Sequence, residues 1–265
     1  MKKFLSVLFA LLMIFSLVSC SNINSGDGDD TDTGADTADI SGNDTTALNA
    51  PPEFEIKEEI IVVHETEDGR KSTKVLRYPQ IRGMEDEEKQ SAVNSLFLDI
   101  AERQFILNVP DVDIYIIEDT IFNYEVSDVE VTYLSSSFIS VKNTVYSMTS
   151  MAEYPDCPVY TVNIDLEKGE IIDEDDIIGD FNIISSKFLA GDFTMVDGAE
   201  NLMENTNYED MILQYKSDYA SYPEIYFTVD SLFLCIDLVP ALGSAATFSI
   251  PLSEIADALI LNPIK

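Results

Sequence analysis

Hydrophobic and polar residues alternate over residues 54–64 and again over residues 72–78, which predicts two strands. Between them lies Glu67-Asp68-Gly69, a tripeptide typical of a hairpin turn. We expect Pro79 to end the second strand, because proline has no N–H group to donate to a sheet. The chain therefore begins its patterned part with a β-hairpin.

A helix and a second hairpin are predicted next. Over residues 84–107 apolar side chains recur at three- and four-residue spacing, and acidic residues stand at the start, where a helix favours negative charge. Residues 122–134 and 138–148 alternate between apolar and polar positions, as half-buried antiparallel strands do. Two strands, a helix and a hairpin make one α+β unit.

The pattern after residue 153 predicts a second α+β unit. Its expected strands are 159–164, 224–229, 232–238 and 247–250, and its expected helices are 173–189, 201–215 and a C-terminal one that starts at Pro251 and packs Ile255, Leu259 and Ile260 inward. The fold class is thus α+β, with a first domain over 51–152 and a second over 153–265.

The first 20 residues carry the pattern of an export signal. Lys2 and Lys3 precede an apolar run over residues 4–18, which is short for a membrane span and suits a signal peptide. The run ends in Leu17-Val18-Ser19-Cys20, which resembles a bacterial lipobox. This resemblance implies that residues 1–19 are removed and that Cys20 is lipidated, so that the protein is anchored to the membrane on its extracytoplasmic face.

Residues 20–50 predict an extended linker. They contain seven Asp, no basic residue and no aromatic residue, so this segment has little to bury and repels itself. The spacing of a calcium-binding loop is absent from it. We interpret it as a spacer between the lipid anchor and the folded domains.

The charge of the chain excludes several partners. It has 49 acidic and 15 basic residues, a formal charge of −34, which argues against binding nucleic acid or anionic lipid. The single histidine, His64, lies at a strand end, and no G-x-S-x-G or phosphate-binding glycine motif occurs. We therefore expect no catalytic residue, no cofactor and no metal site.

The densest acidic cluster of the second half surrounds residues 170–180. Its carboxylates suit a solvated helix N-terminus, the binding of a cation or partner, or the carboxylate pair of a glycosidase. Cys157 and Cys235 either form a disulfide, which an extracytoplasmic location permits, or remain as free thiols, Cys235 then serving as a small apolar residue. The residues that we expect to contact a ligand are Glu153, Tyr154, Asp173, Asp175 and Asp176.

Several segments, in this order, resemble the paired extracytoplasmic domains of RsiV-type anti-sigma factors and PdaC-type peptidoglycan deacetylases. The segments are Tyr78-Pro79-Gln80-Ile81 with Gln90 and Asn94, then 162–170, 225–230 and 248–255. The loop Ser150-Met151-Ala152-Glu153-Tyr154-Pro155 lacks the histidine that this family commonly carries there. The resemblance implies a stand-alone module without the deacetylase or sigma-binding part.

The expected function is binding or sensing. The ligand would be cell-wall glycan or a cationic, lysozyme-like protein, which a strongly negative domain would attract. The alternatives are an envelope enzyme or accessory subunit acting on peptidoglycan, and a structural or assembly lipoprotein.

Overall fold

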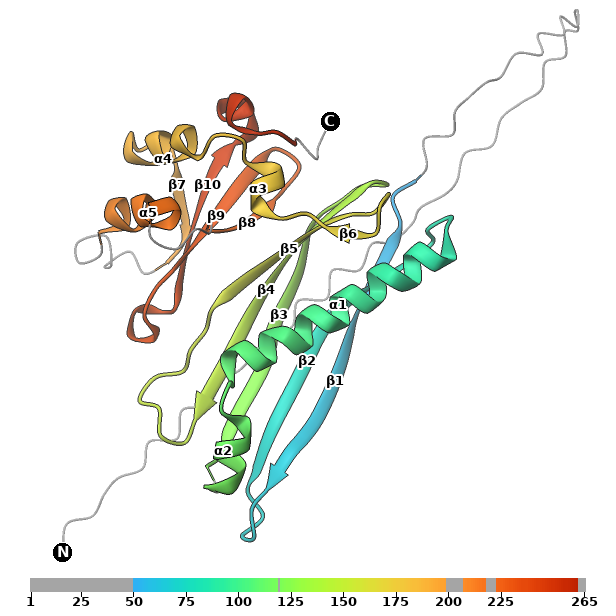
Figure 1. Ribbon diagram of the computed structural model, residues 1–265, viewed down its shortest axis with the longest axis vertical. Helices are drawn as coiled ribbons and strands as arrows, with labels where there is room; N and C mark the ends of the chain where they lie inside the picture. Colours follow the sequence, from blue (N-terminus) through green and yellow to red (C-terminus); the bar gives the residue numbers. More distant parts are fainter. Residues whose placement is uncertain (1–49, 119, 199–206, 218–222, 262–265) are drawn as a thin grey trace, which may run out of the picture. The chain divides into compact units, whose positions relative to one another are not determined.

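The computed structural model describes residues 50–118, 120–198, 207–217 and 223–261, which form two β-sheets with associated helices (Figure 1). The expected α+β class is confirmed. These residues belong to one compact unit, Ala47–Lys265. Within the described ranges, every helix is too short or too polar to cross a membrane. The lipidation site expected at Cys20 lies outside the described residues.

The first sheet has six strands in the order β1-β2-β3-β4-β5-β6. Only β2 and β3 pair in parallel, and the other neighbours are antiparallel. A parallel pair needs a crossover, which α1 (Glu87–Asn108) and α2 (Val112–Ile117) supply. The strands are β1 (Glu53–Glu65), β2 (Lys71–Arg82), β3 (Phe122–Leu134), β4 (Phe138–Thr149), β5 (Val159–Asp165) and β6 (Glu170–Ile171). β5 and β6 thus join this sheet although they follow residue 152.

Strand β2 does not end at Pro79, as expected from sequence, but continues to Arg82. Strand β3 pairs only with Thr73–Val75, so the missing N–H of Pro79 interrupts no strand pairing on that side. Two residues later, Asn94 of α1 takes the place of a neighbouring strand: its Oδ1 accepts from Ile81 N (2.7 Å) and its Nδ2 donates to Ile81 O (3.0 Å).

Helix α1 lies across one face of this sheet (Figure 1). The Asp86 carboxylate caps it by accepting from the backbone N–H groups of Glu88 and Lys89, each at 3.0 Å. Its buried side chains pack on the strands, and Phe105 meets Tyr124 edge to face with ring centres 5.2 Å apart. This packing forms the first hydrophobic core.

The second sheet has the order β7-β10-β9-β8 and carries the second core. The rings of Phe188 and Tyr208 pack edge to face on Phe248, at 4.9 and 5.2 Å. Its strands are β7 (Thr194–Asp197), β8 (Glu224–Phe227), β9 (Ser231–Asp237) and β10 (Ala245–Pro251), and its helices are α3 (Glu174–Ile177), α4 (Phe181–Leu189) and α5 (Tyr208–Ser217). The helix expected over 173–189 is therefore two helices, and residues 201–206 of the next expected helix lie outside the described ranges.

The prediction of a C-terminal helix from Pro251 onward is wrong. Two short 3₁₀ turns, Leu252–Glu254 and Ala256–Ala258, take its place. The following backbone is extended, because Ile260 N donates to Ile177 O (2.8 Å) and thus cannot continue a helix. Ile255 is buried as expected, whereas Ile260 is 69% exposed.

Side chains of β4 and β5 join the two sheets. Ser140 Oγ donates to Asn163 Oδ1 (2.8 Å) and accepts from Phe227 N (3.0 Å), while Asn163 Nδ2 donates to Ile225 O (3.0 Å). We call these bonds the polar seam. They satisfy the outer edge of β8, which no other described strand covers. Strand β5 therefore has one face toward α1 and the other toward β8.

Candidate functional site

A cavity of about 280 Å³ lies between α1, β5, β8 and the segment from β6 to α3. Helix α1 contributes one face, at positions 100, 103, 104 and 107. Its lining residues are Ile100, Arg103, Gln104, Leu107, Tyr160, Thr161, Val162, Asn163, Ile171, Ile172, Asp173, Glu174 and Glu224. The cavity is smaller than the roughly 300–1,000 Å³ typical of drug-sized ligands, so it suits a single chemical group or residue of a ligand.

Glu224 is the central polar residue of this cavity. Its Oε2 accepts two hydrogen bonds from Thr161, one from the backbone N–H (2.6 Å) and one from Oγ1 (2.7 Å). The backbone N–H of Thr161 needs this acceptor because the neighbouring strand β6 pairs with β5 only at Ile164 and Asp165 and so does not extend as far as Thr161. No hydrogen bond from the described residues reaches the other oxygen, Oε1.

No basic side chain of the described residues lowers the pKa of Glu224 or Glu174. The pKa of Glu224 is raised to about 7, mainly because the carboxyl is buried. The two hydrogen bonds from Thr161 lower the pKa, and the carboxylates of Glu174 and Asp237 raise it. Burial, Asp173 and Asp175 likewise raise the pKa of Glu174. Near neutral pH a ligand that approaches Glu224 therefore meets a mixture of its acid and carboxylate forms.

Amide and phenol groups line the α1 side of the cavity. Gln104 is buried, and its Oε1 accepts from Asn143 Nδ2 (3.3 Å), while Asn108 Nδ2 donates to Tyr160 Oη (2.9 Å). Asn143 Oδ1 is buried and has no hydrogen-bond partner among the described residues. Polar groups thus continue from the cavity into the space beneath α1.

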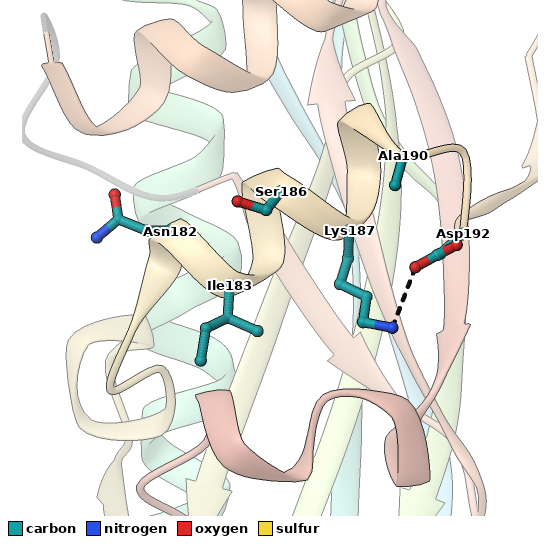
Figure 2. A pocket seen from close by; sticks show the side chains of 6 residues that line it. All are labelled: Asn182, Ile183, Ser186, Lys187, Ala190 and Asp192. Atoms are coloured by element: carbon teal, nitrogen blue, oxygen red, sulfur yellow. Dashed lines mark ion pairs between the residues drawn. The ribbon is translucent and has the colours of Figure 1, made fainter.

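A second depression, of about 410 Å³, lies along α4 and is shown in Figure 2. Lys187 and Asp192 point toward each other there, with Nζ and Oδ2 3.0 Å apart, and Glu254 Oε2 lies 3.8 Å from the same Nζ. The charge of this depression is therefore already neutralised by its own side chains. The cavity at Glu224 is the better candidate for binding.

The structure places the expected ligand residues in two separate regions. Asp173 lines the cavity, and Asp175 and Asp176 are exposed on α3 nearby in the chain. Glu153 and Tyr154 are exposed in the loop between β4 and β5. The loop that holds Glu153 and Tyr154 follows the Thr149 end of β4. β6 and α3 follow the opposite end, where β5 pairs with Phe138 and Ile139, and the two ends lie about 25–30 Å apart along the strands.

Three residues of the cavity, Glu224, Arg103 and Thr161, belong to no pattern that the sequence singles out. Glu224 stands alone in sequence, 44 residues after the end of the acidic cluster, and only the packing of β8 against β5, without strand pairing, brings it to Thr161. One signal was available, since Glu224 immediately precedes the buried run Ile225–Phe227, where a charged residue is unusual.

The possible disulfide between Cys157 and Cys235 is not formed, and both thiols are free. Cys235 is buried in β9, with Sγ 3.6 Å from Thr247 Oγ1, and burial raises its pKa to about 12. Burial and Asp156 also raise the pKa of Cys157. Both thiols are thus held in the protonated, unreactive form. Among the described residues, no group of His, Cys, Asp and Glu side chains is placed to hold a metal ion.

No protein-family model and no curated protein sequence matches the chain. Its fold is similar to that of a DUF3298 family member from Bacteroides fragilis, with a TM-score of 0.53, 14% identity, and coverage of 82% of this chain and 97% of that one. A DUF3298 family protein from Pseudomonas aeruginosa matches over 82% of this chain and 98% of its own, with a TM-score of 0.47 and 8% identity. The first likeness shows a fold shared with a domain of unknown function.

Proposed function

We propose that this chain is a lipid-anchored, non-catalytic binding module on the extracytoplasmic face of a bacterial membrane, and that the cavity at Glu224 holds part of its ligand. The lipobox-like segment that ends in Cys20 supports the anchor. The linker over residues 20–50 supports a domain held away from the lipid surface.

The single observation that carries the binding role is the half-buried Glu224 carboxyl in a cavity that also contains Asp173 and Glu174. Burying a carboxylate without a cation opposes folding, so such a group is a candidate for function rather than for stability. A cationic partner would supply the missing charge. The resemblance to RsiV-type domains supports a lysozyme-like protein as that partner.

Cell-wall glycan is the second candidate ligand. Tyr160 offers an aromatic face and Gln104 an amide at the same cavity, and sugars bind to such combinations of apolar and hydrogen-bonding groups. A glycan differs from a cationic protein in one measurable respect: its binding would change little with ionic strength.

The anchor is tested by labelling cells with radioactive palmitate. The wild-type chain should incorporate label and sediment with membranes, and Cys20→Ser should do neither. Unlabelled wild-type protein, or protein found in the cytosol, would refute the location that we propose.

The ligand class is tested by retention of the purified full chain on immobilised lysozyme and on purified cell-wall sacculi, each at low and at moderate salt. Retention on lysozyme that falls steeply with salt supports the cationic partner. Salt-independent retention on sacculi supports glycan, and retention on neither refutes both.

A further inference from the structure

The hydrogen-bonding groups of the cavity are unequally used. Both Thr161 donors serve Glu224 Oε2, and the Asn163 amide is engaged at both ends, since its Oδ1 accepts from Ser140 and its Nδ2 donates to Ile225 O. The oxygens without a donor among the described residues include Glu224 Oε1 and the Asp173 carboxylate, while Gln104 Nε2 is a remaining amide donor. Besides the donors of Gln104 and Arg103, the cavity therefore presents a group of carboxylate acceptors.

The remaining wall is aliphatic. Ile100, Leu107, Val162, Ile171 and Ile172 line it, and two of them keep much of their surface in contact with water, Leu107 with 60% and Ile171 with 43% exposed. Aliphatic side chains this exposed beside a group of carboxylates gain from contact with an apolar chain. A ligand that fits must combine a hydrogen-bond-donating charged end with a hydrocarbon stem.

Arg103 is the basic residue among the lining residues. It is exposed on α1 and makes no ion pair within 4.0 Å with any described carboxylate. The groups that lower the pKa of Glu224, and so oppose the effect of its burial, are the two donors of Thr161 and not a guanidinium. Arg103 thus contributes positive charge to the lining without neutralising Glu224, and because its repulsion grows with the charge of the ligand it opposes a dication more than a monocation.

Resting on the proposed binding function, we propose that this cavity binds a single primary alkylammonium group, with the ammonium on Glu224 and its hydrocarbon stem against the aliphatic wall. An –NH₃⁺ group supplies three donors to the carboxylates of the cavity, and it is compact enough for a cavity of about 280 Å³. The source is either a free aliphatic amine or a lysine side chain, which share this chemistry.

Proton linkage gives this site a signature. An ammonium ion favours the charged form of Glu224, so binding releases protons near the pKa of about 7 and weakens as the pH falls below it. The other titratable or charged groups that line the cavity are Asp173, Glu174, Tyr160 and Arg103, and Asp237 of β9 also acts on Glu224 from outside the lining. Glu174 also has a raised pKa, so it weakens binding in the same direction at lower pH.

Isothermal titration calorimetry of the purified full chain at pH 8 tests the proposal with pentylamine, with 1-pentanol as its uncharged counterpart, and with the amide of Nα-acetyl-lysine. We expect pentylamine to bind at least tenfold more tightly than 1-pentanol, and binding to weaken at least fivefold at pH 5.5. Equal affinities of the amine and the alcohol, or no binding of either amine, would overturn the proposal. Binding of pentylamine alone identifies a free amine as the source, and binding of both identifies lysine as a ligand.

Two variants and one control locate the binding. Glu224→Gln keeps an acceptor for Thr161 and should lower pentylamine affinity at least tenfold, and Leu107→Lys should abolish binding by placing a tethered ammonium in the cavity from an exposed position. Glu85→Gln, at an exposed residue that precedes α1 and lies outside the lining, should change affinity less than twofold. Unchanged affinity in Leu107→Lys, with an unchanged melting temperature, refutes the site even if Glu224→Gln unfolds.

The outcome is separable from that of the proposed function. Retention on sacculi that Leu107→Lys abolishes, without any amine binding, would refute the ammonium chemistry and leave the binding module in place. Amine binding by a chain that carries no palmitate would refute the anchor and leave the cavity chemistry in place.

Discussion

The face of β1, β2 and β3 and the cavity at Glu224 are both rich in acidic residues, but only the first region neutralises them. Arg77 lies between Glu58 and Glu125, with N–O distances of 2.7 and 2.5 Å. At the cavity, Thr161 hydrogen bonds take the place of a cation on Glu224. Most basic residues of the chain precede residue 150, so the second half holds its acids largely uncompensated. A missing counter-ion, rather than acidity itself, distinguishes the candidate site.

The largest expected effect is the pH dependence that Glu224 gives to stability. Its folded-state pKa of about 7 lies above the ordinary 4.5, so the folded state binds the proton more tightly, and this contribution is full below pH 4.5 and lost as the pH rises through 7. The difference corresponds to about 3 kcal/mol. Urea denaturation of wild type and Glu224→Gln between pH 4.5 and 8 should show the wild type losing about this much relative to the variant. Parallel pH curves would contradict the assignment.

Asn163→Leu should have the next largest effect, because it removes the acceptor of the Ser140 hydroxyl proton and the donor to Ile225 O in the buried polar seam. We expect the free energy of unfolding to fall by about 2 kcal/mol. The matched control is Asn123→Leu, whose residue accepts from Thr73 Oγ1 (3.1 Å) at the surface of the same sheet and should change stability by less than about 0.5 kcal/mol. Similar losses of stability in both variants would show that the polar seam contributes no more to stability than a surface hydrogen bond.

Arg77→Met should turn the neutralised face into one like the cavity, with Glu58 and Glu125 left without a cation and Val126 O without a donor. The expected loss is about 1 kcal/mol, because these groups keep access to water. Denaturation at 0.05 M and 1 M salt checks it: screening should reduce the loss. A loss that grows with salt would speak against a charge effect.

Lys187→Met should have the smallest effect. The ion pair of Lys187 with Asp192 lies in the open depression of Figure 2, where water screens both charges. We expect a change below about 0.5 kcal/mol by the same denaturation assay. A loss comparable to that of Arg77→Met would mean that the α4 depression depends on its charge pair more than its exposure suggests.

Local sequence patterns predicted most elements, because alternation and helical spacing depend on which face is buried. They failed where tertiary contacts decide: Asn94 lets β2 continue past Pro79, and the contact of Ile260 N with Ile177 O replaces a terminal helix by turns. For the cavity, too, local patterns identified some residues and tertiary contacts decided the others. Asp173 was found within a local acidic cluster, whereas Glu224 reaches Thr161 across 63 positions and leaves only a charged residue before a buried strand as a trace.

Strand β5 also restricts how the chain can change in length. Its odd and even residues serve different partners, with Thr161 and Asn163 bonded to β8 and Val162 and Ile164 in the core under α1. One inserted residue would reverse the direction of every side chain beyond it, so that apolar groups would face the edge of β8 and amides would enter the core. Relatives of this chain should therefore vary in length in the loop between β4 and β5 and keep the length of β5 itself.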